Sequence, residues 1–146
     1  MRRKIYDQLV KWKQVRDGST ALMIEGARRI GKSYIAEEFA RNEYDSYILI
    51  DFSKAPTRVK GWFDEYLEDV DALLHNIQLH YKKHLTPRKS LIIFDKVQKC
   101  PRARESIKAL VAVRTACSAL LSLFSKKVTI SEKKFVSLHF DMAVYF

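Results

Sequence analysis

Eight consecutive residues decide how this sequence is interpreted: Gly26-Ala27-Arg28-Arg29-Ile30-Gly31-Lys32-Ser33. They satisfy the pattern G-x-x-x-x-G-K-[S/T], in which glycines allow backbone N–H groups to turn inward around a phosphate chain. In such a loop the lysine reaches the terminal phosphates, and the serine hydroxyl is a ligand of the Mg²⁺ that bridges phosphate oxygens. All eight residues are therefore predicted to bind the phosphates of a nucleotide.

The residues on either side of this loop supply the context that the motif requires. Residues 20–25 form a short apolar run typical of a buried strand, and residues 32–42 carry apolar side chains at helical spacing. A helix that starts at the loop directs its positive dipole end toward the bound anion. The alternative is a glycine-rich structural turn, and the order strand, loop, helix favours nucleotide binding over it.

The third apolar strand expected along the chain, Ser90-Leu91-Ile92-Ile93-Phe94-Asp95, lies about 60 residues after the loop and ends in a carboxylate. In P-loop nucleotide-binding proteins a carboxylate at this place holds the Mg²⁺ shell. Many buried strands end in Asp, so this feature alone is weak evidence for a magnesium site. Its position after the loop, at the spacing expected in P-loop proteins, strengthens that evidence. Ser33 and Asp95 are thus the predicted metal ligands, and ATP with Mg²⁺ is the predicted ligand pair. Asp51 ends another apolar strand, expected beside the loop strand, where it either reaches the Mg²⁺ shell or caps a loop.

The order of the expected elements predicts an α/β fold, a parallel-sheet P-loop NTPase with helices on both faces. Apolar runs and helical periodicity place strands at 20–25, 46–52 and 90–95, and helices at 3–15, 32–42, from 56 to 87 with a break near Asp69 or Asp71, and from Pro101. After residue 112 the pattern weakens. Residues 113–124 suit a strand or a helix, and 126–130 and 135–138 resemble short strands.

Length and charge narrow the class of protein. The 146 residues suit one domain, interpreted as a P-loop domain over 1–112 and an atypical basic tail over 113–146 that either completes the sheet or is poorly ordered. The net charge of +10 is concentrated after residue 95, which leaves an anionic partner such as nucleic acid open beside a merely solvated basic face. No apolar run approaches the ~20 residues of a membrane span, so no membrane is expected.

Three stretches carry a resemblance to a known family: residues 24–33, residues 47–52, and residues 93–101, in which Asp95 is followed by Val97-Gln98. Over about residues 3–112 the chain resembles the N-terminal ATPase domain of prokaryotic AAA-type ATPases that carry an additional C-terminal domain of unknown function. The resemblance implies a cytoplasmic protein that binds ATP with Mg²⁺, with ATP hydrolysis in intact members. It leaves the oligomeric state open.

Two departures from that family weaken the expectation of hydrolysis. Members usually carry Glu directly after the strand-ending Asp, whereas this chain has Lys96, whose ammonium has no acceptor for a proton. Members are also longer and continue with a sensor residue on a fourth strand, for which Thr115 and Ser118 are the polar candidates. The chain is therefore expected to be an ATP-binding fragment, incomplete at its C-terminus, with no catalytic residue assigned. The alternatives are a P-loop kinase of small molecules or nucleotides, and a non-catalytic nucleic-acid-binding module.

Overall fold

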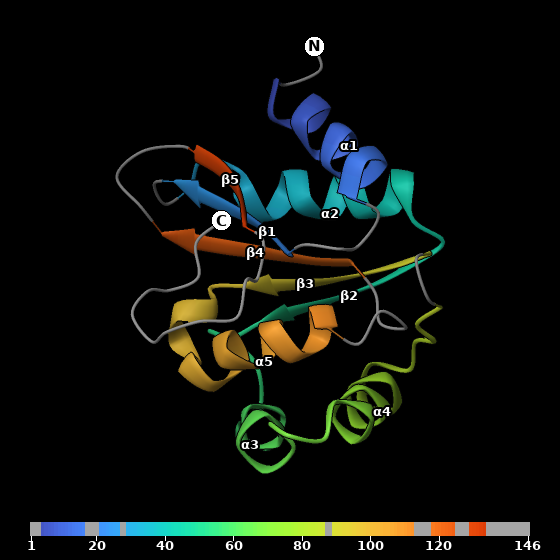
Figure 1. The fold of residues 1–146 in the computed structure, drawn as a ribbon. Coiled ribbons are helices and arrows are strands. Elements are labelled where there is room, and N and C mark those ends of the chain that lie inside the picture. Colours follow the sequence, from blue (N-terminus) through green and yellow to red (C-terminus); the bar gives the residue numbers. More distant parts are fainter. Residues whose placement is uncertain are drawn as a thin grey trace.

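A five-stranded sheet with helices on both faces organises the chain (Figure 1). The computed structural model describes residues 4–16, 21–26, 29–86, 89–112, 118–124 and 129–133. In Figure 1, α1 (Lys4–Arg16) and α2 (Lys32–Glu43) lie above the sheet. Below it lie α3 (Thr57–Glu65), α4 (Val70–Tyr81) and α5 (Pro101–Ala112), so the predicted α/β architecture is confirmed.

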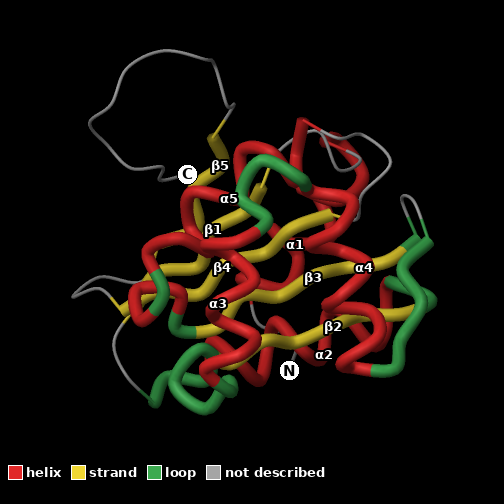
Figure 2. Tube along the Cα trace, turned by 90° about the horizontal axis from the view of Figure 1, so that it is seen from below, coloured by secondary structure: helices red, strands yellow, loops and turns green. Residues whose placement is uncertain are grey.

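The strands follow one another across the sheet in the order β2-β3-β4-β1-β5, which Figure 2 shows from below. Their bounds are β1 (Ala21–Gly26), β2 (Ser46–Asp51), β3 (Ser90–Asp95), β4 (Ser118–Phe124) and β5 (Thr129–Lys133). The pairs β2–β3, β3–β4 and β4–β1 are parallel, as predicted, whereas β5 runs antiparallel to β1. The connection from β4 to β5 is too short for the crossover that a parallel strand needs, so the chain turns back along β1.

The helices and first three strands agree closely with the sequence prediction. The expected break in the long helical stretch lies at Asp69, whose carboxylate accepts a hydrogen bond of 3.0 Å from the Ala72 N–H and so caps α4. Pro87, the expected end of that stretch, lies outside the described residues. One short 3₁₀ helix, η1 (Val97–Lys99), follows β3 and was not predicted.

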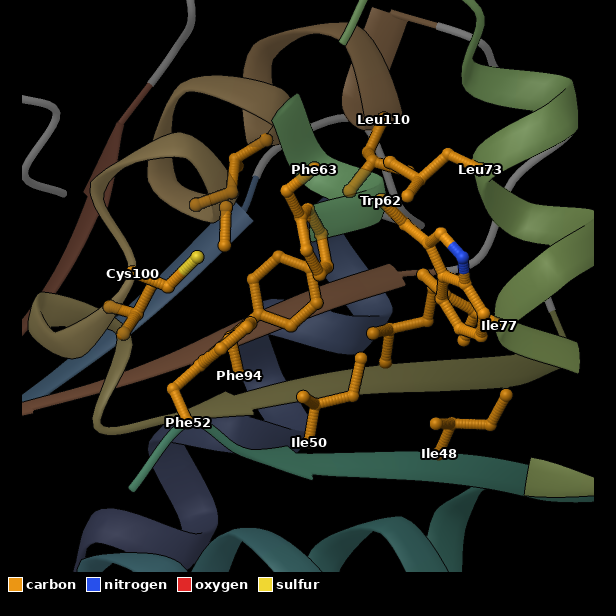
Figure 3. Close-up of a cluster of buried hydrophobic side chains, with 14 of the residues drawn as sticks. Ile48, Ile50, Phe52, Trp62, Phe63, Leu73, Ile77, Phe94, Cys100 and Leu110 are labelled. Carbon is orange, nitrogen blue, oxygen red and sulfur yellow. The ribbon is translucent and has the colours of Figure 1, made fainter. Parts of the chain in front are cut away.

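Two apolar layers, one on each face, fix the position of β3. Leu91 and Ile93 pack with α1 and α2, whereas Ile92 and Phe94 point to the opposite face. There Phe94 joins the side chains of α3, α4 and α5 that Figure 3 shows. All six residues of β3 are buried, because both faces of this central strand are covered.

The structure assigns the ambiguous region after residue 112 in part. Residues 118–124 form β4, which pairs with β1 on one side and β3 on the other, and the strand expected at 126–130 is β5 at Thr129–Lys133. The strand expected at 135–138 lies outside the described residues, as does Thr115. Ser118 is wrong as a sensor candidate, because it is the first residue of β4 and lies opposite Leu91. It is therefore at the end of the strands far from the loop between β1 and α2.

Candidate functional site

The predicted site lies where the parallel strands end. Gly26 is the last residue of β1, Asp95 of β3 and Asp51 of β2, and Asp51 lies directly opposite Asp95 in the β2–β3 register. In open α/β sheets, ligands bind beyond the carboxyl ends of the strands. Strand order corrects one expectation: Asp51 is not on a strand beside β1, because β4 and β3 both lie between β1 and β2.

The loop between β1 and α2 has a backbone that most side chains disfavour. Gly31, the residue that caps α2, has φ 87°, and Arg29 has φ 63° although it is not glycine. Successive turns of this kind direct backbone N–H groups into a concave anion-binding surface. Arg29, Ile30, Gly31, Lys32 and Ser33 are thus placed between the end of β1 and the first turn of α2; Ala27 and Arg28 lie outside the described residues.

The contact that joins the loop to β3 is a hydrogen bond of 2.8 Å from the Ser33 hydroxyl to a carboxylate oxygen of Asp95. The two residues are 62 positions apart, and Asp95 is 4% exposed. Lys32 lies close enough for its charge to interact with Asp95. Burial lowers the pKa of the Lys32 ammonium, and the Asp95 carboxylate opposes part of that shift. The structure therefore brings Ser33, Asp95 and Lys32 together.

Lys96 makes a second polar cluster beside the first. Its ammonium lies 2.8 Å from an oxygen of Asp51, 3.0 Å from the Ser53 hydroxyl and 4.0 Å from Asp95. The other oxygen of Asp51 accepts from the Ser53 hydroxyl at 2.6 Å and from the Ser53 N–H at 2.9 Å. The side chain of Lys96 thus extends toward the end of β2, and its ammonium also lies 4.0 Å from the Asp95 oxygen that accepts from Ser33.

The pKa values in this cluster follow from these contacts. Burial opposes ionisation of Asp51, but the hydrogen bonds from Lys96 and Ser53 outweigh it, so the pKa of Asp51 lies below its usual value. The hydrogen bond with Asp51 raises the pKa of Lys96. This pairing was not predicted, although the sequence has an acid at the end of one strand and a lysine just after the next.

An aromatic cluster beneath the site holds the two strand ends in place. Phe52 follows Asp51, Phe94 precedes Asp95, and both rings meet Phe63 of α3 edge to face, with ring centroids 5.4 and 5.6 Å apart (Figure 3). Phe52 and Phe94 are themselves in contact at 5.4 Å, and the Phe52 N–H donates to the Asp95 carbonyl at 3.0 Å. The two carboxylates thus lie directly beside a fully buried aromatic cluster.

Comparison with known proteins agrees with this geometry. A family model described as an AAA domain matches residues 18–138, most of the chain. The chain belongs to the AAA domain family. It is therefore a P-loop nucleotide-binding, ATPase-like module, which favours an ATPase over the kinase alternative. A search of curated proteins found no match.

The AAA domain extends further along the chain than the sequence resemblance indicated. The match continues past residue 112 and includes β4 and β5, whereas α1 precedes it. Membership implies nucleotide binding and leaves assembly into oligomers open. Among the helices that the structure describes, none combines the length and apolar composition needed to cross a bilayer.

Proposed function

We propose that this AAA domain binds Mg²⁺-ATP through residues 26–33 and Asp95, and that it hydrolyses ATP poorly. The observation that carries the proposal is the 2.8 Å hydrogen bond between Ser33 and Asp95. It brings the hydroxyl of the loop and the carboxylate of β3 to one point at the start of α2, with Lys32 beside them. This is the arrangement that a nucleotide polyphosphate with its cation requires.

The residues present fit a magnesium ion that arrives with the nucleotide. Mg²⁺ takes oxygen ligands and usually keeps several waters, with one or two protein ligands and the phosphates completing its shell. Ser33 and Asp95 supply two such oxygens, and within the described ranges no cluster of three or more His, Cys, Asp or Glu forms a metal cage of its own. When bound, the ion would neutralise charge on the phosphate oxygens.

The polar groups next to Asp95 argue against efficient hydrolysis. A water molecule that attacks the terminal phosphate needs an acceptor for its proton, and the Lys96 ammonium has none. Asp51 is the carboxylate beside it, but one of its oxygens is engaged by Lys96 and the other by Ser53. Loss of a general base typically lowers the rate by 10²–10⁴-fold, so we expect binding with little turnover.

Titration of fluorescently labelled ATP with and without Mg²⁺ tests the proposed site. Wild-type protein should bind ATP more tightly when Mg²⁺ is present. Ser33→Ala and Asp95→Asn should each weaken the binding of ATP in the presence of Mg²⁺ by about 10- to 150-fold, since a contact to a charged group contributes roughly 1.5–3 kcal/mol. Binding without Mg²⁺ should be retained.

Ser46→Ala is the matched control for the hydroxyl. Ser46 is the first residue of β2, at the end of the strands opposite to the proposed site. Its hydroxyl donates to the His84 carbonyl at 2.8 Å. Removing it makes the same chemical change away from the proposed site. Equal Mg²⁺ dependence in Ser33→Ala, Ser46→Ala and wild-type protein would contradict the assignment of Ser33.

A further inference from the structure

An exposed aromatic ring stands directly beside the predicted phosphate site. Large apolar or aromatic side chains that are well exposed are few in the described part of the chain: Val15, Ile30, Tyr34 and Leu79. Two of them, Ile30 and Tyr34, flank Gly31, Lys32 and Ser33. Tyr34 is 63% exposed, although it lies in the first turn of a helix whose other face is fully packed.

Helix geometry explains why the Tyr34 ring faces solvent. The buried stripe of α2 consists of Ile35, Ala36, Phe39 and Ala40, and Tyr34 precedes this stripe on the outer side. Other tyrosines in this region are covered. The rings of Tyr6 and Tyr44 both pack edge to face on Phe39, and the Tyr47 hydroxyl donates to Glu37 at 2.8 Å.

The backbone of Tyr34 belongs to the phosphate-facing end of α2. The first hydrogen bond of the helix runs from the Ile35 N–H to the Gly31 carbonyl at 3.0 Å. This end of α2 follows the loop directly, and the N–H groups at a helix N-terminus form a favourable place for an anion. The ring of Tyr34 is thus attached one residue beyond Ser33, next to the proposed phosphate-binding residues.

We infer that Tyr34 provides the surface on which the purine base of the bound nucleotide stacks. The inference rests on the proposed ATP site, and adds to it the residue that contacts the nucleoside. A flat π-system such as a purine base can stack on an exposed aromatic ring and stabilise the complex. Such stacking depends little on hydrogen bonds to the edges of the base. The site accordingly separates into a phosphate-binding part, with Lys32 and Ser33, and a base-binding part, with Tyr34.

The test compares a ligand that has a base with one that has none. Affinities for ATP and for inorganic tripolyphosphate are measured with Mg²⁺ present, for wild-type protein and for Tyr34→Ala. Removing the ring should weaken ATP by about 5- to 100-fold, the range expected for one stacked base, and leave tripolyphosphate unchanged. Tyr34→Phe, which keeps the ring, should bind ATP nearly as well as wild-type protein.

Leu79→Ala is the control for loss of an exposed apolar side chain. Leu79 is 64% exposed on α4, on the opposite face of the sheet, and its removal should change neither affinity. Because Tyr34 is exposed, the melting temperature of Tyr34→Ala should equal that of wild-type protein, which separates a binding effect from misfolding.

Three outcomes would overturn the inference, and they are distinguishable. Equal ATP affinity in Tyr34→Ala and wild-type protein, while Lys32→Ala loses both ligands, would reject the stacking role and keep the phosphate site. Failure of wild-type protein to bind either ATP or tripolyphosphate would reject the proposed function and the inference together. Equal losses of ATP and tripolyphosphate in Tyr34→Ala would place Tyr34 in the phosphate-binding part and reject stacking.

Discussion

The ammonium of Lys96 lies 2.8 Å from the carboxylate of Asp51, so the residue after β3 is paired with the last residue of β2. The charge of Lys96 is therefore already compensated, and its side chain is held on the β2 side of the site. This arrangement explains how a cation is accommodated next to Asp95.

Breaking this pair should have a small and pH-dependent effect on stability. In Lys96→Met the free energy of unfolding should fall by about 0.5–1 kcal/mol, because the Lys96 side chain is 42% exposed and solvent screens the interaction. The pKa of Asp51 is lowered on folding, so its contribution is present above its unfolded pKa of about 3.9 and is lost as the pH falls through the folded value.

The stability that Lys96 contributes depends on pH in the opposite direction. Its pKa is raised on folding, so its contribution is present below about pH 10.4 and is lost as the pH rises through the folded value. The stability difference between wild-type protein and Lys96→Met should thus be constant from about pH 5 to 9 and shrink below about pH 4. Urea unfolding at pH 7, 5 and 3.5 measures it, with Lys99→Met as control. A difference that grows on acidification would reject the ion pair as its cause.

A second prediction concerns the restoration of hydrolysis. Lys96→Glu alone would place a third carboxylate beside Asp51 and Asp95, so repulsion should limit the gain in turnover. The double variant Asp51→Asn, Lys96→Glu removes that repulsion. It should raise the ATPase rate by about 10²-fold if the missing base is the only defect.

Steady-state phosphate release measures this rescue, with Lys99→Glu as the control for added negative charge. The wild-type rate tests whether Lys96 makes hydrolysis slow. A wild-type turnover near ~1 s⁻¹, an ordinary value for enzymes, that is abolished by Lys32→Ala would show that Lys96 does not obstruct hydrolysis.

A third prediction concerns the aromatic support beneath the site. Phe63 is fully buried and contacts both Phe52 and Phe94, so Phe63→Ala should lower the free energy of unfolding by about 3–5 kcal/mol. Denaturant unfolding measures the loss. Leu79→Ala, at an exposed position, should change it by less than about 0.5 kcal/mol. Similar values for the two variants would show that the cluster does not anchor the strand ends.

Local patterns predicted the individual elements well, because each rests on the spacing of apolar residues within one segment. The loop before α2 and the strand ending in Asp95 were predicted for the same reason, since both are contiguous motifs. Strand order was not predictable in this way, because it depends on which crossover passes over which strand. The sequence therefore placed Asp51 beside the loop strand, whereas β3 and β4 separate them.

The pairing of Lys96 with Asp51 was missed for a related reason. The resemblance drew attention only to the acid expected in place of Lys96. Its actual partner lies 45 residues earlier and comes into reach only because β2 and β3 pair in register. Likewise, Ser118 was a polar candidate for the site on sequence alone, but the direction of β4 places it at the opposite end of the strands.

The placement of β4 yields a fourth prediction. β4 pairs with strands on both sides, whereas among the described strands β5 pairs with β1 alone and is the last in the sheet. Amides of Ser118–Phe124 should thus exchange with deuterium about as slowly as those of Ser90–Asp95, and those of Thr129–Lys133 should exchange faster. Exchange of β4 at the rate of unstructured peptide would show that residues 113–146 form a tail separate from the sheet.

The most direct test of the account is the affinity for Mg²⁺-ATP of wild-type protein and Lys32→Ala. Lys89→Ala is the matched control, since it removes the same charge just before β3, at the end of the strands opposite to the loop. We predict that wild-type protein and Lys89→Ala bind ATP equally, and that Lys32→Ala binds it about 10- to 100-fold more weakly with its affinity for adenosine unchanged. Equal affinity for ATP in all three proteins would contradict the assignment of residues 26–33 as the phosphate-binding loop.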